Sequence, residues 1–383
     1  MNKLPLSICL IGSFFASCAS EGSKNLTPLN PPKVYPITAP AAGNYPQGLF
    51  KYPYRAMSLA EEDFTQTLEW SPKVEKTFAA DTQYTAVLTL APVMSGSAFI
   101  GTTLEDISGL PSDGVETITA ETDNRNLVIR ILFEKTSSVK AQAQIIFSDD
   151  FEGTSLNRDK WEECPEWDRQ GRSSWRDNMV SVSGGMLHLK FVRNAPKDWI
   201  LCGAIRSRKK NGSVIFENSY GFYESRIKFP QIEGTWGAFW LMSPTQHILS
   251  DEGIDGTEID IVETINNHEK KYNAAIHWNG YGSQHKSAGS GEKAKPVNIY
   301  DGEFHTFALD WSPSEYVFYV DGHEFWRVNG GAAFKNSGIN QNPNYIKLTV
   351  ESAEWAGSLP NKFKESEMLV DYVRVYNQPQ IAN

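Results

Sequence analysis

The stretch GTEIDIVETI combines the apolar pattern of a buried strand with three acidic residues, Glu258, Asp260 and Glu263. Side chains on a regular strand alternate between its two faces, so Glu258 and Asp260 share a face and Glu263 points the other way. A β-bulge near Ile261 and Val262 would add one residue and return Glu263 to the face of the other acids. We therefore expect one strand to present three carboxylates side by side.

Carboxylates that share a face repel one another and raise one another's pKa, so stability alone does not explain this arrangement. A retaining glycosidase needs two carboxyl groups about 5–5.5 Å apart, one as nucleophile and one as general acid and base. A third acid can hydrogen-bond the nucleophile and adjust its charge. The alternatives are a solvated charged edge and a cation site. Calcium loops carry Gly and Asn between their ligands, whereas Ile and Val separate these acids, which favours the floor of a catalytic cleft.

The run Glu-Ile-Asp-Ile-Val-Glu resembles the signature of glycoside hydrolase family 16, in its bulged form with an extra residue before the last Glu. The resemblance covers about residues 146–377 and implies a catalytic domain with a β-jelly-roll fold and a concave, cleft-bearing sheet. It makes Glu258 the nucleophile, Asp260 its assistant and Glu263 the acid/base. Other matching stretches, in order, are 149-DDFEG-153, 220-YGFYESRIKFP-230, 234-GTWGAFWLM-242, 304-FHTFALDWSP-313, 318-FYVDG-322 and 370-VDYVRVY-376.

The elements that must position the acids consist almost entirely of short strands. Apolar and polar residues alternate along 186–190, 306–311 and 369–376, with turns between them and little helical periodicity. No P-loop or dinucleotide-binding glycine pattern interrupts them. Many short strands of this kind predict an all-β double-sheet jelly roll.

A second strand-rich region precedes the catalytic one, over about residues 48–143. Period-two alternation along 84–90 and 127–133, with Gly, Pro and Ser between strands, predicts a small β-sandwich. This region resembles the immunoglobulin-like accessory domains of bacterial surface proteins. We expect it to act as a spacer, with glycan binding as the alternative.

Aromatic residues flank the acidic strand in the sequence. Sugar rings present apolar faces, so polysaccharide clefts need aromatic platforms with polar groups between them. Trp236 and Trp240 would share one face of a strand, and the resemblance places that strand beside the acids. Core packing is the alternative. The resemblance also implies sugar contacts from His277, close to the acid/base, and from Trp355 and Glu351.

The substrate is narrowed by the bulged signature, which laminarinase-like β-glucanases share with agarases, porphyranases and carrageenases. Trp-x-Ala-Phe-Trp resembles the laminarinase form, although laminarinases usually carry Pro where this chain has Gly237. Sulfated galactans call for a basic cleft, and no dense Arg/Lys cluster lies near the acids in sequence. We expect an endo-acting retaining hydrolase of a β-1,3- or β-1,3/1,4-glucan. The alternatives are an endo-β-galactanase acting on agarose, porphyran, carrageenan or mucin-type glycan, a transglycosylase, and a non-catalytic surface glycan-binding protein.

The N-terminal segment predicts export. An apolar run after Lys3 is too short to span a bilayer and predicts a secretory signal over residues 1–17. Phe-Ala-Ser-Cys resembles a lipobox, which implies acylation of Cys18, a membrane contact through this lipid, and location in the cell envelope at the outer membrane of a Gram-negative bacterium. An ordinary signal peptide is the alternative. Residues 18–47 are dense in Pro and predict an extended tether.

Composition limits the remaining partners. A net charge of −10 disfavours a nucleic-acid partner, because few basic groups would neutralise phosphates. The expected partner is a polysaccharide, bound by a monomer. No cofactor or catalytic metal is expected, although the resemblance weakly implies a structural Ca²⁺ ion near Asp371. Cys164 and Cys202 either pair in the exported chain or stay as buried thiols.

Overall fold

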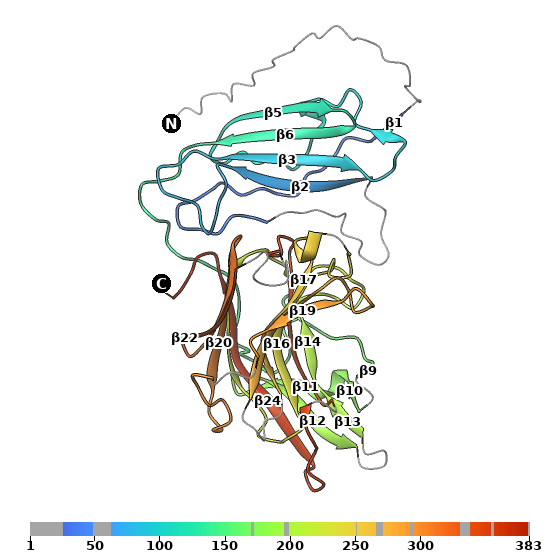
Figure 1. Cartoon of the computed structure of the whole chain (residues 1–383), viewed down its shortest axis with the longest axis vertical. Coiled ribbons are helices and arrows are strands. Elements are labelled where there is room, and N and C mark those ends of the chain that lie inside the picture. The colour runs from blue at the N-terminus through green and yellow to red at the C-terminus, as the bar shows by residue number, and fades with distance from the viewer. Residues whose placement is uncertain are drawn as a thin grey trace. The chain divides into compact units, whose positions relative to one another are not determined.

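The computed structural model describes residues 26–48, 63–169, 172–194, 199–249, 251–265, 271–291, 295–329, 338–353 and 356–381. The chain divides after Gln142 into two compact units, close to the predicted boundary (Figure 1). Apart from short 3₁₀ turns, the regular structure of the described residues consists of strands, which confirms the all-β expectation. None of the described helices has the length and apolar character required to cross a bilayer. The predicted signal peptide and Cys18 lie outside the described residues.

The first unit contains a four-stranded antiparallel sheet with the order β2–β3–β6–β5. The predicted alternation is confirmed, since Leu88, Leu90, Ile129 and Ile131 are all fully buried in its core. A second antiparallel sheet does not occur among the described residues of this unit, so the immunoglobulin-like sandwich stays a prediction. The strands of this unit are β1 (Thr27–Pro28), β2 (Phe64–Ser71), β3 (Thr85–Pro92), β4 (Ser97–Ala98), β5 (Val115–Asp123) and β6 (Asn126–Phe133).

The Pro-rich segment predicted as a tether differs from the expectation in its described part. Thr27 and Pro28 pair in parallel with β4, and Lys33 bridges to Ser108. Val34 and Ile37 are 1% and 5% exposed in the core of the first unit. Proline removes backbone donors and so prevents a regular ladder, but it does not prevent apolar side chains between the prolines from being buried. This part of the segment is therefore folded against the unit.

The second unit holds two sheets that pack face to face (Figure 1). A seven-stranded sheet has the order β19–β18–β17–β16–β23–β14–β8, and an eleven-stranded sheet contains β22–β21–β20–β15–β24–β12–β13–β10–β9 with β7 and β11 at its side. β23 and β17 of the smaller sheet contact β12, β13 and β20 of the larger one. Together with the fold comparison below, these two layers confirm the predicted jelly-roll sandwich.

Apolar side chains between the two sheets form the core of the second unit. Phe191, Phe307, Trp311, Ile259 and Leu348 are fully buried there. Burying one such side chain stabilises the folded state by roughly 1.5–3 kcal/mol, so this layer fixes the register of both sheets. The strands are β7 (Ile145–Asp149), β8 (Glu162–Glu163), β9 (Asp168–Arg169), β10 (Ser173–Trp175), β11 (Val180–Ser183), β12 (Met186–Asn194), β13 (Trp199–Cys202), β14 (Ala204–Arg206), β15 (Gly221–Lys228), β16 (Trp236–Met242), β17 (Thr257–Thr264), β18 (Tyr272–Trp278), β19 (Lys286–Gly289), β20 (His305–Trp311), β21 (Glu315–Val320), β22 (His323–Asn329), β23 (Tyr345–Glu351) and β24 (Glu365–Tyr376).

The two cysteines of the second unit are free. Cys164 and Cys202 are both buried thiols in this structure. Burial raises the pKa of each thiol, so both stay protonated near neutral pH. They contribute to the core as small apolar side chains.

Candidate active site

The acidic strand contains the predicted bulge. In the pairing of β17 with β18, Asp260 lies opposite Ala275 and Glu263 lies opposite Asn273, so two residues of β17 face one residue of its neighbour. The register with β16 shifts at the same place. The extra residue returns the third acid to the face of the other two, which confirms the bulge. The apolar residues of the strand, Ile259, Ile261 and Val262, are fully buried behind the acids.

A cavity of about 820 Å³ lies over this face of the seven-stranded sheet. Its lining follows the period of two that strands impose, because alternate residues of β16, β17, β18 and β23 point into it. These residues are Trp236, Ala238, Trp240 and Met242; Glu258, Asp260 and Glu263; Asn273, Ala275 and His277; and Tyr345, Lys347, Thr349 and Glu351. The predicted carboxylates therefore share a cleft with the predicted aromatic platforms.

Glu263 has the environment of a general acid. The Trp236 indole Nε1 donates a hydrogen bond to Glu263 Oε1 at 2.9 Å. Burial, followed by the charge of Glu258, raises the pKa of Glu263 to about 7, although hydrogen bonds from Trp236 and Asn273 lower it in part. A carboxyl group with this pKa holds a proton near neutral pH and can transfer it.

Glu258 differs from Glu263 in its partner. The Tyr281 hydroxyl donates a hydrogen bond to Glu258 Oε2. Burial raises the pKa of Glu258, while the Tyr281 hydrogen bond and the nearby charge of Lys347 act against that increase. The two carboxyl groups thus have different partners and different tendencies to ionise, as double displacement requires.

Asp260 lies between these two acids on the strand and faces a histidine pair. His277 Nε2 lies 3.4 Å from Asp260 Oδ2, and His277 Nδ1 shares a 3.0 Å hydrogen bond with His285 Nε2. Burial, then the charges of Glu263 and Glu258, raise the pKa of Asp260 well above its usual value. Burial and the neighbouring His285 lower the pKa of His277 to about 4, so its imidazole is neutral.

His277 was expected near the acid/base, and the structure places it elsewhere. It pairs in register with Glu258 and its ring lies beside Asp260. Asn273, four residues before His277 on the same face of β18, lies opposite Glu263. The residue opposite the third acid is therefore an amide, because His277 pairs with Glu258 before the bulge.

Three of the other residues predicted to contact sugar line the cavity, and one lies outside the described residues. Trp236 and Trp240 line the cavity, as expected, while Phe239 between them is fully buried in the core. Glu351 also lines the cavity, but its carboxylate forms an ion pair with Arg169 at 2.9 Å. Trp355 lies outside the described residues.

The cavity is also lined by three basic residues that lie far apart in the sequence. Arg169, Arg206 and Lys347 come from three strands and all face it. Lys347 Nζ lies 3.7 Å from the centroid of the Trp240 ring, and Arg169 lies 4.4 Å from that of Trp175. Lys347 carried a usable signal, because in β23 polar residues alternate with buried apolar ones, as they do in the acidic strand. Arg169 carried none, since only the fold brings its short strand to the cleft.

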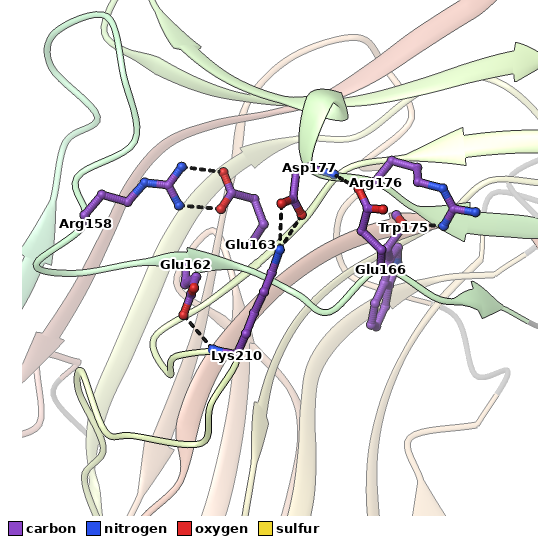
Figure 2. A network of polar contacts seen from close by, with 8 residues as sticks. All are labelled: Arg158, Glu162, Glu163, Glu166, Trp175, Arg176, Asp177 and Lys210. Carbon is purple, nitrogen blue, oxygen red and sulfur yellow. Dashed lines mark hydrogen bonds and ion pairs between the residues drawn. The ribbon is translucent and has the colours of Figure 1, made fainter.

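Figure 2 shows a polar network around Trp175 and the residues that follow it. Lys210 Nζ contacts both oxygens of Asp177, at 2.7 and 2.6 Å, and its backbone N–H donates to Glu162. The backbone N–H of Asp177 donates to Glu166 at 3.0 Å. The remaining pairs of the network are Arg158 with Glu163 and the Arg176 guanidinium with the Trp175 carbonyl. These bonds hold one wall of the cleft on the sheet.

The surroundings of Gly237 explain why this position is not the proline that is usual in laminarinases. Its backbone N–H donates to Thr264 Oγ1 at 2.7 Å, a hydrogen bond that proline could not make. A Cβ atom at this position would lie 2.7 Å from the Phe229 ring. Glycine therefore lets β16 approach its neighbours closely next to the acids.

Asp371, near which the resemblance implies a structural Ca²⁺ ion, pairs with an arginine. Its carboxylate accepts a 2.6 Å hydrogen bond from Arg226 and is already paired with that cation. Among the described side chains, Glu258, Asp260 and His277 come close enough to share a metal ion. The structural Ca²⁺ ion and the expectation of no catalytic metal both stay predictions.

Comparison with known proteins identifies the family. Residues 142–378 match the family model for the GH16 domain of β-porphyranases A–D, which is more than half of the chain. The chain belongs to glycoside hydrolase family 16. The family resemblance of the acidic strand is thereby confirmed.

Two curated relatives illustrate the range of this glycoside hydrolase family. The chain is 28% identical over 267 residues to a keratan-sulfate endo-1,4-β-galactosidase of Sphingobacterium multivorum, covering 66% of this chain and 59% of the relative. It is 25% identical over 269 residues to glucan endo-1,3-β-glucosidase A1 of Niallia circulans, covering 63% of this chain and 39% of the relative. The chain thus spans less than two thirds of the length of either relative.

A solved structure supports the fold. A family 16 enzyme of the mixed-linkage glucan locus of Bacteroides ovatus superposes with a TM-score of 0.50 at 23% identity. The match covers 60% of this chain and all of that structure. It agrees with the jelly-roll architecture of the second unit.

Proposed function

We propose that this family 16 protein is an endo-acting retaining β-glycoside hydrolase. The observation that carries the proposal is the bulged strand, which places Glu258, Asp260 and Glu263 together on the floor of the 820 Å³ cavity. Trp236 and Trp240 beside them provide apolar faces for sugar rings. Different partners for Glu258 and Glu263 support different roles for the two carboxyl groups.

In the first step, protonated Glu263 donates its proton to the glycosidic oxygen while the Glu258 carboxylate attacks the anomeric carbon. The bond from that carbon to the oxygen breaks, the leaving sugar departs as an alcohol, and a glycosyl ester forms on Glu258. In the second step, Glu263 accepts a proton from water as the water oxygen attacks the same carbon. The ester bond breaks, the sugar is released with retained configuration, and Glu263 is protonated again.

The substrate we favour is a polysaccharide with β-linked galactose. Arg169, Arg206 and Lys347 line the cleft, so the reason for excluding charged galactans no longer holds. The match to the β-porphyranase domain and to the keratan-sulfate endo-β-galactosidase supports this choice. A β-1,3- or β-1,3/1,4-glucan is the second candidate, supported by the glucanase relative. The lipid anchor at Cys18, the envelope location and the monomeric state stay predictions.

A polysaccharide panel tests both candidates. The panel contains porphyran, agarose, keratan sulfate, mucin, laminarin and mixed-linkage β-glucan, and products are separated by chromatography. Glu258→Gln and Glu263→Gln should lower the rate on the active substrate by at least about 1000-fold while the fold is kept. Glu365→Gln, an exposed acid at the start of β24, is the matched control.

Each outcome of the panel has a definite meaning. Galactose-containing oligosaccharides would support the galactan, and glucose oligosaccharides would move the specificity to a glucan. Retained binding without products from any polysaccharide would indicate a glycan-capturing protein. Full activity in Glu258→Gln would overturn the assignment of the nucleophile.

A further inference from the structure

Tyr281 is a residue of the cleft that the sequence pattern did not indicate. It follows β18 in the sequence, lies 62% exposed, and lines the cavity. Its hydroxyl donates a hydrogen bond to Glu258 Oε2. An exposed aromatic side chain that reaches a buried carboxylate is well placed to control that carboxylate.

The loop that carries Tyr281 is held at both sides. Asn279 and Gly280 adopt left-handed φ values of 63° and 66°, and the Gly280 N–H donates to the Gln246 carbonyl at 2.9 Å. The His285 N–H donates to the Gly282 carbonyl at 3.1 Å. The turn is therefore defined by hydrogen bonds on each side of Tyr281.

The ring of Tyr281 also rests on the histidine pair. Its centroid lies 5.4 Å from that of His285, and the rings of His285 and His277 stack at 5.2 Å with an angle of 4°. His277 in turn contacts Asp260. Tyr281 is thus linked to two of the three acids, to one directly and to the other through imidazoles.

The Tyr281 hydroxyl keeps its proton near neutral pH and acts as a donor. Most of the side chain is exposed, but its hydroxyl end reaches into the cleft, where burial, then the charge of Glu258, raises the pKa of the hydroxyl. A hydrogen bond donated to a carboxylate favours the ionised form. It engages Oε2 of Glu258 and so restricts the rotation of the carboxylate.

We propose that Tyr281 is a positioning residue that orients the Glu258 carboxylate through this hydrogen bond and favours its ionised form. The inference rests on the proposed function, in which Glu258 is the nucleophile. The charged and titratable groups that surround Glu258 besides Tyr281 are Asp260, Glu263, Glu351, Arg169, Lys347 and His277. Tyr281 donates to Glu258 from outside the sheet, and it can be altered without replacing any residue of the strands.

The test compares Tyr281→Phe with Tyr300→Phe. Tyr300 is the matched control, because its hydroxyl donates to the Lys271 carbonyl at 2.6 Å and to no acid. Each variant loses one hydroxyl group and keeps its ring. On the active polysaccharide of the panel, Tyr281→Phe should lower kcat by about 10- to 100-fold, the size expected for a hydrogen bond to a charged group. The acidic limb of its pH profile should move to higher pH, with KM little changed.

A second measurement needs no substrate. The protonation of Glu258 is followed by NMR of protein labelled with ¹³C at the glutamate side-chain carboxyl carbon, and the signal is assigned with Glu258→Gln. The pKa of Glu258 should rise in Tyr281→Phe and stay unchanged in Tyr300→Phe. An unchanged pKa and an unchanged acidic limb would overturn the role of Tyr281.

The two proposals fail in different ways. If Glu258→Gln retains activity, the proposed function fails whatever Tyr281 does. If Glu258→Gln is inactive and Tyr281→Phe behaves like Tyr300→Phe, only the positioning role fails. A raised pKa in Tyr281→Phe without any hydrolysis by the wild type would keep the hydrogen-bond role and reject the enzyme.

Discussion

At the scale of single residues, the site separates three chemically similar acids by their neighbours. Glu263 accepts from an indole, Glu258 accepts from a phenol, and Asp260 faces the neutral ring of His277. Both donors favour the ionised form of the acid that they contact, whereas burial and the charges of neighbouring acids favour the protonated form. The division of roles between proton donor and nucleophile therefore depends on residues outside the acidic strand.

Replacing Trp236 tests this dependence. Trp236→Phe removes a hydrogen bond that lowers the pKa of Glu263, so that pKa should rise above its value of about 7. Glu263 must be protonated to act as an acid, and activity is lost as pH rises through its pKa. The alkaline limb of kcat/KM should therefore move upward by roughly one pH unit. Trp240→Phe is the control, since the Trp240 indole donates to Thr349, which does not titrate. An alkaline limb that moves equally in both variants would contradict the role of this bond.

At the scale of elements, short strands depend on specific polar contacts at their ends. The bulge in β17 turns an irregular spacing into a common face, and Gly237 lets β16 approach it. The start of β20 is fixed by His305, whose ring contacts Asp321 at 2.7 Å and Asp301 at 3.0 Å. These contacts tie β20 to the turn between β21 and β22.

The contacts of His305 predict how its contribution to stability depends on pH. Burial alone would lower the pKa of His305, but hydrogen bonds to Asp321 and Asp301 outweigh it, and the net pKa is raised. The stabilisation is therefore complete below the unfolded pKa near 6.5 and is lost as pH rises through the folded pKa. Relative to wild type, His305→Asn should lose about 2 kcal/mol of unfolding free energy at pH 5.5, and less at pH 8.5. Urea unfolding at both pH values measures this, with the exposed His323→Asn as control. Equal losses at the two pH values would exclude a charged His305.

At the scale of the whole molecule, the catalytic constellation lies entirely within the second of the two units. That unit buries three carboxyl groups, and burial disfavours their charged forms. This lowers stability, so a fold selected for stability alone would not contain these acids. The large apolar layer between its sheets offsets this cost. Function is thus supported by a core that has nothing to do with the chemistry.

Removing one of these buried acids should stabilise the second unit. The folded pKa of Glu263, about 7, exceeds its ordinary value of 4.5, so the native state is favoured below pH 4.5 and loses stability as pH rises through 7. Glu263→Gln cannot ionise, and it should be more stable than wild type at pH 8 by up to roughly 3 kcal/mol. At pH 4 the two proteins should unfold alike. Calorimetry measures both, with Glu365→Gln as control, and a variant that is destabilised at pH 8 would show that the charged form of Glu263 is favoured by the fold.

The sequence by itself determined the features that depend on local periodicity. The alternation of apolar and polar residues with a period of two indicated the strands. The spacing of Glu258, Asp260 and Glu263 indicated a bulge. The same period put Trp236 and Trp240 on one face. Such features need only the geometry of a single strand, so they can be derived without knowing what packs against it.

Only the tertiary structure decided which distant residues meet the acids. Tyr281 reaches Glu258 from a loop, and Arg169 arrives on a short strand almost ninety positions upstream of the acids. The placement of His277 beside Asp260 depends on the register between β17 and β18. Burial and cross-strand register are non-local properties, and together they set the pKa of every acid in the cleft. Spacing along the chain therefore indicated where the chemistry lies, while the assembled fold decided which carboxyl group keeps its proton.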